Sequence, residues 1–275
     1  MIVLNQYRDK WLGEKFDEVI GFYPREFYCL DNFSSFKVFY ENYLYATVEE
    51  AYQASKFIGF APEVVKLIQN CYSAHDSKKI ARRHIDKIRA DWLEVNLTIM
   101  EELLRLKLAQ NPYIEEELLK TLDYQLVEDS PYDDYWGWGS NRDGQNKLGI
   151  LWMKLRSEIR KKHNMKLNAD SLGMLESGEK EVEYRLNDEK RQQLRVGDII
   201  TFTKLSDEDK TLSVIITDLK KYKTLLEMYT ASFDQYLSKN YITPKEAVEA
   251  TDYYSDEEIE KHGCLAIHIK KINER

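Results

Sequence analysis

The sequence predicts an α+β protein with a mostly helical first part and a β-rich second part. Residues 91–111 carry apolar side chains at helical spacing, which indicates a long helix in the first part. A length of 275 residues suits two domains. We therefore expect a helical domain with a small β element at 1–163 and a small barrel-like domain at 164–275. Segments rich in β-branched and aromatic residues lie in the second part at 180–186, 198–205, 211–219 and 264–272.

The elements of the first part follow from local patterns. Extended segments are expected at 26–30 and 36–47, with a hairpin turn at Glu41 and Asn42. Helices are expected at 48–59, at 62–70 from Pro62, at 91–111 with Asp91 as cap, and from Asn111–Pro112 onward. The 91–111 helix has so wide an apolar stripe that we expect it to be mostly buried. Its apolar residues are Trp92, Leu93, Val95, Leu97, Ile99, Met100, Leu103, Leu104, Leu106 and Leu108.

A long loop at 129–146 precedes a helix expected at 147–162. Loops of this length in a compact domain are usually functional or disordered, and the aromatic residues here argue against disorder. Further helical pieces should separate the strands of the second part, at 169–177, 222–229, 244–250 and 255–262.

Composition and charge exclude some classes of function. The net charge of −8 argues against a chain that coats nucleic acid non-specifically. Three scattered cysteines fit a reducing cytoplasm, and we expect neither an export signal nor a membrane span. No histidine spacing predicts a metal site, and no cofactor is expected. One basic run is either a solvated helix face or a phosphate-facing patch, and it holds Lys78, Lys79, Arg82, Arg83, Lys87 and Arg89.

The stretch ATVEEAYQASKF at 46–57 carries two adjacent glutamates at the start of a helix. Thr47 and Glu50 fit a capping box, in which the Glu50 side chain accepts the N–H of Thr47. The capping box gives no role to Glu49. The helix face that carries Glu49 is either a solvated polar surface or a ligand site. The residues that share this face at helical spacing are Tyr52, Gln53 and Lys56.

The loop at 129–146 contains a second cluster of functional residue types. Asp133 and Asp134 precede the aromatic run YWGWG at 135–139. Glycine lets a backbone approach a ligand closely, and indoles beside carboxylates suit a sugar or a base. A loop lid anchored by its tryptophans is the plainer interpretation.

Several blocks together resemble the NADAR family, also called YbiA-like. The resemblance implies a mostly helical fold with a small β element and a pocket between them. It also implies N-glycosidase activity, either on phosphorylated intermediates of the riboflavin pathway or on ADP-ribosylated guanine in DNA. The blocks, in family order, are DNFSSF (31–36), ATVEEAYQASKF (46–57), KKIARR (78–83), DWLEVNLTIMEELLRLKLAQNP (91–112), LVEDSPYDDYWGWG (126–139) and NKLGILWMKLR (146–156).

The resemblance implies roles for individual residues. Glu49 matches the catalytic glutamate of the family, with Lys56 and Asp133 as further candidates for catalysis. The sequence departs from the family pattern at Ala81, usually glycine, and at Glu50, often histidine. The substrate contacts implied are Asn32, Phe33, Tyr52, Gln53, Arg82, Trp92, Trp136, Gly137, Asn146 and Gly149.

The chemistry fits these residue types. Breaking a ribosyl C–N bond builds oxocarbenium character, which a carboxylate such as Glu49 or Asp133 can stabilise, and one of them can activate water. Lys56 can hold a phosphate as a cation or attack the anomeric carbon as a neutral amine.

The stretch 177–202 carries a G-x-K-x-x-E-x-R pattern followed by a tight turn at Gly197–Asp198. On a strand, Glu183 and Arg185 would share one face, and a buried ion pair is the simpler interpretation. Residues 165–272 resemble an ASCH domain, a PUA-like barrel. This implies binding of RNA or modified nucleosides, with Lys180, Glu183 and Arg185 as contacts. Some ASCH relatives are amidohydrolases that use a threonine where this chain has Glu183, so we favour binding.

The combined hypothesis is an N-glycosidase of the cytoplasm. Its substrate would be ADP-ribosylated guanine in DNA or a ribosylamino-pyrimidine phosphate, and its ASCH domain would bind nucleic acid, either DNA or RNA, or a nucleotide. One alternative is a non-catalytic sensor of ADP-ribose, and another is an ASCH amidohydrolase with an accessory first domain.

Overall fold

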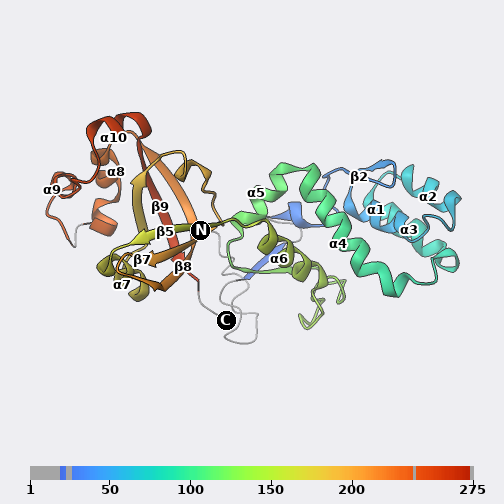
Figure 1. Ribbon diagram of the computed structural model, residues 1–275. Coiled ribbons are helices and arrows are strands. Elements are labelled where there is room, and N and C mark those ends of the chain that lie inside the picture. Colours follow the sequence, from blue (N-terminus) through green and yellow to red (C-terminus); the bar gives the residue numbers. More distant parts are fainter. Residues whose placement is uncertain (1–18, 23–26, 238–239, 273–275) are drawn as a thin grey trace. The chain divides into compact units, whose positions relative to one another are not determined.

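The computed structural model describes residues 19–22, 27–237 and 240–272. The chain divides into two compact units, Met1–Ile159 and Arg160–Arg275 (Figure 1). Helices dominate the first unit and a five-stranded sheet forms the second, so the predicted α+β class is confirmed. None of the helices in the described ranges is long and apolar enough to cross a bilayer.

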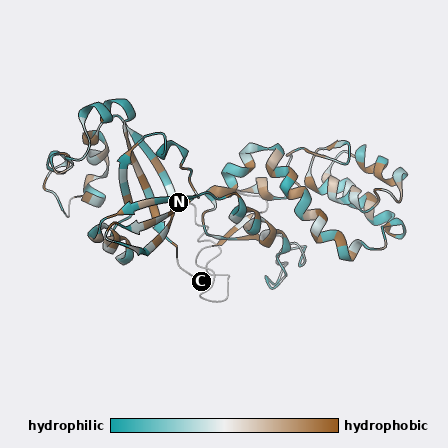
Figure 2. Ribbon diagram, in the orientation of Figure 1, coloured by the Kyte–Doolittle hydropathy of each residue, from teal (hydrophilic) through white to brown (hydrophobic). Residues whose placement is uncertain are grey.

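The first unit packs helices around two small pairs of strands (Figure 1). Strands β1 (Val19–Phe22) and β4 (Gln125–Glu128) are parallel, and β2 (Val38–Tyr40) and β3 (Tyr43–Tyr45) form an antiparallel hairpin. The helices are α1 (Val48–Ser55), α2 (Pro62–Gln69), α3 (Ala74–Arg83), α4 (Trp92–Gln110), α5 (Pro112–Lys120) and α6 (Lys147–Ile159), with 3₁₀ turns η3 (Tyr28–Leu30) and η4 (Ile85–Lys87). Figure 2 shows hydrophilic and hydrophobic residues mixed along these helices, as expected where one face packs on a core.

The hairpin prediction is confirmed, and the extended segment before it is wrong. Glu41 and Asn42 adopt φ of 47° and 60°, the left-handed pair that a two-residue hairpin turn requires. The segment predicted to be extended at 26–30 instead contains η3, which begins after Phe27 with φ of 59°, while residue 26 lies outside the described residues.

Helix α4 is the centre of the first core, but its first turn is not buried. Ile99, Met100, Leu103 and Leu104 are at most 8% exposed, whereas Leu93 is 87% exposed. The apolar stripe therefore runs beyond the part of the helix that the core covers. Asp91 stands at the N-cap position without capping, because its carboxylate pairs with Arg89 at 2.6 Å.

The second unit is one sheet in the order β5-β7-β8-β9-β6. Helix α6 was predicted to run to residue 162, but it ends at Ile159, and β5 pairs in parallel with β7. Helix α8 begins three residues later than predicted, because β8 continues to Tyr222 and Thr224 caps the helix. The elements are β5 (Lys162–Leu167), α7 (Ala169–Ser177), β6 (Val182–Leu186), η5 (Arg191–Gln193), β7 (Ile199–Lys204), β8 (Asp207–Tyr222), α8 (Leu225–Ser232), η6 (Phe233–Leu237), α9 (Pro244–Glu249), α10 (Asp256–His262) and β9 (Cys264–Lys271).

Helix α6 packs against β4 at a glycine. A Cβ built on Gly149 would lie 2.2 Å from the carbonyl oxygen of Leu126, closer than any real contact. Helix α7 offers a contrast, since a Cβ on Gly173 would meet nothing within 4 Å. Alanine substitutions at the two glycines therefore distinguish the effect of close backbone contact from that of helix propensity.

We expect Gly149→Ala to lower the free energy of unfolding by about 1–3 kcal/mol, because α6 must move away from β4. The control, Gly173→Ala, should raise it by about 0.5–1 kcal/mol through helix propensity alone. Denaturant unfolding of the full chain measures both. Equal effects of the two substitutions would contradict the close packing of α6 on β4.

Candidate functional site

A small cavity of about 140 Å³ lies in the first unit. Its wall combines the loop after η3, helices α1 and α3, the end of β4 and the loop that follows it. Most of its wall is polar or aromatic. The lining residues are Asn32, Phe33, Glu49, Tyr52, Gln53, Lys56, Lys78, Glu128, Asp133 and Trp136.

Helix α1 brings Glu49 into this cavity. The Thr47 hydroxyl accepts the N–H of Glu50 at 3.1 Å and so caps the helix, as predicted. The Glu50 carboxylate accepts the N–H of Ala46 at 2.9 Å, one residue before the predicted partner. All of α1 is buried, with Glu49 only 5% exposed. The solvated polar face considered from the sequence is therefore wrong.

The Gln53 amide joins the two charged groups of α1. Its Nε2 donates to Glu49 Oε1 at 2.7 Å, and its Oε1 accepts from Lys56 Nζ at 2.7 Å. Both ends of the amide are thus used, which fixes its orientation. Glu49 and Lys56 lie seven residues apart on one helix face and are held in register through this one side chain.

Burial shifts the pKa of each of the two charged groups in the direction that favours its uncharged form. It raises the pKa of Glu49, against the opposing effect of Lys78 and the hydrogen bond from Gln53. Burial lowers the pKa of Lys56 to about 8, against the attraction of Glu49. The lowered pKa lets Lys56 exchange protons near physiological pH, and the raised pKa makes Glu49 a stronger base than an exposed carboxylate.

Aromatic rings enclose the Lys56 ammonium. Its Nζ lies 5.4 Å from the ring centroid of Tyr52 and 5.3 Å from that of Trp92, within cation–π range. The Tyr52 ring contacts Trp136 edge-on at 5.5 Å. Trp92 is not part of the cavity wall and so contacts the site through Tyr52 and Lys56.

Asp133 shapes the loop as well as lining the cavity. Its Oδ1 accepts the N–H groups of Tyr135 at 3.1 Å and Trp136 at 2.8 Å. This turn directs the Trp136 ring into the cavity wall. One carboxylate oxygen is therefore committed to the loop, which makes Glu49 the better placed of the two carboxylates for chemistry.

Three predicted substrate contacts lie behind the wall. The Asn146 side chain accepts the N–H of Glu128 at 3.1 Å and donates to the carbonyl of Leu126 at 2.9 Å. A Cβ on Gly137 would lie 2.6 Å from the carbonyl oxygen of Glu128, and one on Gly149 would lie 2.2 Å from that of Leu126. Asn146 and the two glycines hold the end of β4, and their contacts fix the position of Glu128.

Helix α4 anchors the loop that carries Asn32 and Phe33. The fully buried Lys107 Nζ donates to the carbonyl of Asp31 at 2.9 Å and to the hydroxyl of Ser34 at 2.8 Å. Burial lowers the pKa of Lys107 to about 7. The loop is further tied to α1, because the Glu49 N–H donates to the carbonyl of Asn32 at 3.0 Å.

Two lining residues, Lys78 and Glu128, were not among the predicted substrate contacts. Lys78 lies in the basic run, and its Nζ is 5.8 Å from the Phe33 ring centroid. Arg82 is exposed one turn further along α3 and is not a lining residue, although its charge helps to lower the pKa of Lys56. Signals for both were present, because Lys78 opens the block KKIARR and Glu128 lies in the block LVEDSPYDDYWGWG, which resemble the NADAR family.

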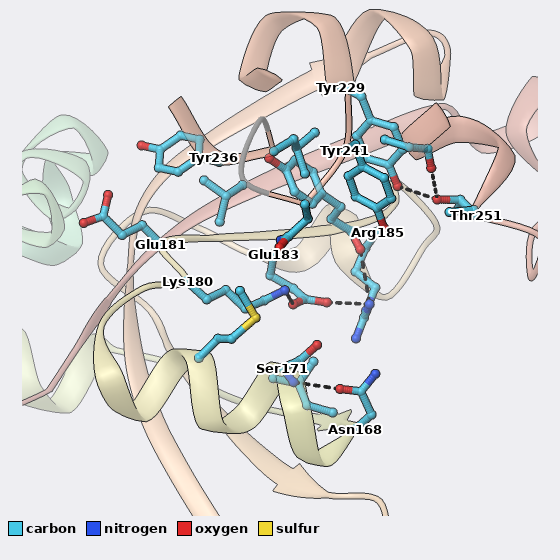
Figure 3. A pocket seen from close by; sticks show the side chains of 18 of the residues that line it. Asn168, Ser171, Lys180, Glu181, Glu183, Arg185, Tyr229, Tyr236, Tyr241 and Thr251 are labelled. Carbon is cyan, nitrogen blue, oxygen red and sulfur yellow. Dashed lines mark hydrogen bonds and ion pairs between the residues drawn. The ribbon is translucent and has the colours of Figure 1, made fainter. Parts of the chain in front are cut away.

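The second unit contains a larger pocket of about 530 Å³ (Figure 3). Lys180, Glu183 and Arg185 lie together on its wall. Lys180 Nζ is 3.1 Å from Glu183 Oε2, Arg185 also pairs with Glu183, and Glu183 is 2% exposed. The predicted strand, shared face and ion pair are confirmed. Segments between β8 and β9 add tyrosines to the lining, namely Tyr229, Tyr236, Tyr241 and Tyr253.

Within residues 19–22, 27–237 and 240–272, no group of three or more His, Cys, Asp or Glu side chains could hold a metal ion.

Comparison with known proteins bears on both units. An N-glycosidase of Nostoc punctiforme is 38% identical over 133 residues, which span 48% of this chain and 85% of that protein. The chloroplastic riboflavin biosynthesis protein PYRR of Zea mays is 35% identical over 125 residues, 42% of this chain but only 20% of that protein. The NMR structure of YbiA from E. coli, 29% identical, covers 52% of this chain and 86% of that one with a TM-score of 0.48.

Both resemblances predicted from the sequence are confirmed by matches to family descriptions. Residues 165–273 match the ASCH domain. Residues 13–160, more than half of the chain, match the NADAR domain. The chain therefore belongs to the NADAR domain family and carries an ASCH domain after its NADAR domain.

Proposed function

We propose that the first unit hydrolyses the N-glycosidic bond of a ribosyl substrate. The observation that carries this proposal is the buried arrangement of Glu49, Gln53 and Lys56 in one small cavity with Trp136. The names of the relatives support it, since the Nostoc protein is called an N-glycosidase.

The size of the cavity favours a sugar ring. Its volume of about 140 Å³ is well below the roughly 300–1,000 Å³ of pockets that enclose whole drug-sized ligands. Only a ring-sized part of a substrate fits inside, so the base extends outward and any phosphate lies beside the lining cations Lys56 and Lys78. The cleaved bond would then lie at the cavity mouth.

The proposed reaction follows from the Glu49 carboxyl. As the bond between C1 and the base nitrogen breaks, positive charge develops on the ribosyl ring, and ionised Glu49 stabilises it. Water then bonds to C1, one of its protons passes to a carboxylate, and the leaving nitrogen keeps the electron pair and gains a proton. The raised pKa of Glu49 makes its carboxylate a stronger base for this proton than an exposed carboxylate would be.

Two substrates remain in the proposal. The cationic Lys78 and Arg82 near the cavity suit a phosphorylated ribose, which both ADP-ribosylated guanine in DNA and a ribosylamino-pyrimidine phosphate supply. The name of the maize relative favours the pyrimidine phosphate. An ASCH domain on the same chain favours a substrate on nucleic acid.

We assign binding rather than hydrolysis to the second unit. The resemblance to ASCH domains implies that Glu183 stands where hydrolytic relatives use a threonine, and Lys180 pairs with this carboxylate at 3.1 Å. The tyrosines of the lining provide stacking surfaces for a base. A nucleotide or one base of a nucleic acid is the proposed ligand, contacted by Lys180, Glu183 and Arg185.

Glu49→Gln tests the proposed reaction. We expect kcat to fall by at least about 10³-fold, because the substitution removes the ionisable carboxyl but keeps the side-chain volume. Release of base is measured with ADP-ribosylated guanine in a DNA oligonucleotide and, in parallel, with a ribosylamino-pyrimidine phosphate. Glu50→Gln is the matched control and should retain activity, since its side chain contacts the helix cap.

Cleavage of one substrate identifies it as the preferred class. Wild-type rates in folded Glu49→Gln would refute the role of Glu49. If wild type binds ADP-ribose but cleaves neither substrate, the non-catalytic sensor replaces the enzyme.

We assign Lys56 the role of a phosphate-binding cation. Since its pKa is about 8, the charge is present below pH 8 and is lost as pH rises through this value. The value of kcat/KM for a phosphorylated substrate should therefore fall above about pH 8. Lys56→Arg should keep activity to higher pH, because guanidinium remains charged.

The opposite profile would identify Lys56 as a nucleophile. In that case kcat/KM would rise through pH 8, Lys56→Arg would be inactive, and borohydride would trap a covalent adduct between Lys56 and the sugar.

A further inference from the structure

Two acceptor atoms in the wall of the 140 Å³ cavity lack partners. Asn32 Oδ1 and Glu128 Oε2 are buried and have no hydrogen-bond partner within the described part of the chain. Asn32 is 5% exposed and Glu128 is 9% exposed. Buried polar atoms are rarely left unpaired in native proteins, because the lost hydration is not repaid. Both atoms are therefore candidates to receive hydrogen bonds from a ligand.

Both acceptors are held in place by their backbones. Glu128 pairs with Phe22 of β1, its N–H donates to Asn146, and its carbonyl accepts the N–H of Trp138 at 3.3 Å. Asn32 is tied to Glu49 through its carbonyl, and its Nδ2 points to the Met100 sulfur at 3.5 Å. These contacts fix the backbone positions from which the two side chains project into the cavity wall.

We infer that Asn32 and Glu128 bind the 2′,3′-diol of ribose and make the site specific for ribosyl over 2′-deoxyribosyl substrates, an inference that rests on the proposed function. A hydroxyl group both donates and accepts, so it can pair with the Asn32 amide oxygen and with the Glu128 carboxyl in either protonation state of that carboxyl. The 2′-hydroxyl lies beside the anomeric carbon, which places the diol in the same cavity as Glu49.

Other occupants fit the two atoms less well. A phosphate presents mainly acceptor oxygens, which cannot donate to the amide oxygen of Asn32. The cations Lys56 and Lys78 lie on the α1 and α3 side of the same cavity. The sugar ring is thus expected to enter with its diol towards Asn32 and Glu128.

The test compares ribosyl and 2′-deoxyribosyl substrates with the same base and the same 5′-phosphate. Wild type should prefer the ribosyl form by roughly 10⁴-fold in kcat/KM, because the deoxy form leaves a buried acceptor unpaired. Glu128→Ala and Asn32→Ala should each reduce this preference by at least about 10-fold. Comparing variants with wild type removes the intrinsic difference in lability between the two sugars.

Two further variants separate hydrogen bonding from general disruption. Glu128→Gln keeps an acceptor oxygen and should keep most of the preference. Asp134→Asn changes an exposed carboxylate in the same loop and should leave the preference unchanged.

The outcomes distinguish this inference from the proposed function. Equal cleavage of both sugars, or an unchanged preference in both alanine variants, overturns the inference while the glycosidase remains. If neither substrate is cleaved, the proposed function fails. The diol site is then tested by calorimetry with ribose 5-phosphate and 2-deoxyribose 5-phosphate. Tighter binding of ribose 5-phosphate, lost in Glu128→Ala, supports the diol site, and equal affinities refute it.

Discussion

The first unit depends on one buried amide that holds a carboxyl and an ammonium in register. Gln53 donates to Glu49 and accepts from Lys56, and all of α1 around it is buried. Charged groups are expensive to bury unless their hydrogen bonds are made, so this arrangement persists only because each end of the amide is used. The cost appears in the raised pKa of Glu49 and the lowered pKa of Lys56, and shifts in these directions are frequent at functional sites.

The rest of the cavity wall comes from the end of β4, the loop that follows it and the loop after η3. Asn146, Gly137 and Gly149 have no place in the wall, yet they fix the end of β4 and therefore the position of Glu128. Asp133 sets the turn that places Trp136. Lys107 ties the Asn32 loop to α4. Rigid positioning of this kind matters more than the number of polar groups, because a site gains from groups that are oriented before the ligand arrives.

Sequence patterns predicted the parts of this site that are local. The helical spacing brought together Glu49, Gln53 and Lys56, and the turn at Glu41–Asn42 followed from residue type. The position of Glu128 in the wall could not be predicted from local spacing, because its exposure to the cavity depends on the pairing of β4 with β1, far away in sequence. Leu93 was predicted to be buried but is exposed, because an apolar stripe indicates which face of a helix is apolar but not where along the helix the core ends. Strand β5 was missed because Lys162–Leu167 carries basic residues that continue the polar end of α6.

Each unit has a pocket with buried polar residues and aromatic rings, and the ribosyl group could bind in either one. The structure of the Glu49→Gln variant bound to an uncleaved ribosyl substrate distinguishes between the two most directly. Our account predicts that the sugar ring occupies the small cavity of the first unit, with its C1 facing residue 49. A sugar bound only in the pocket of the second unit, with the small cavity empty, would contradict it.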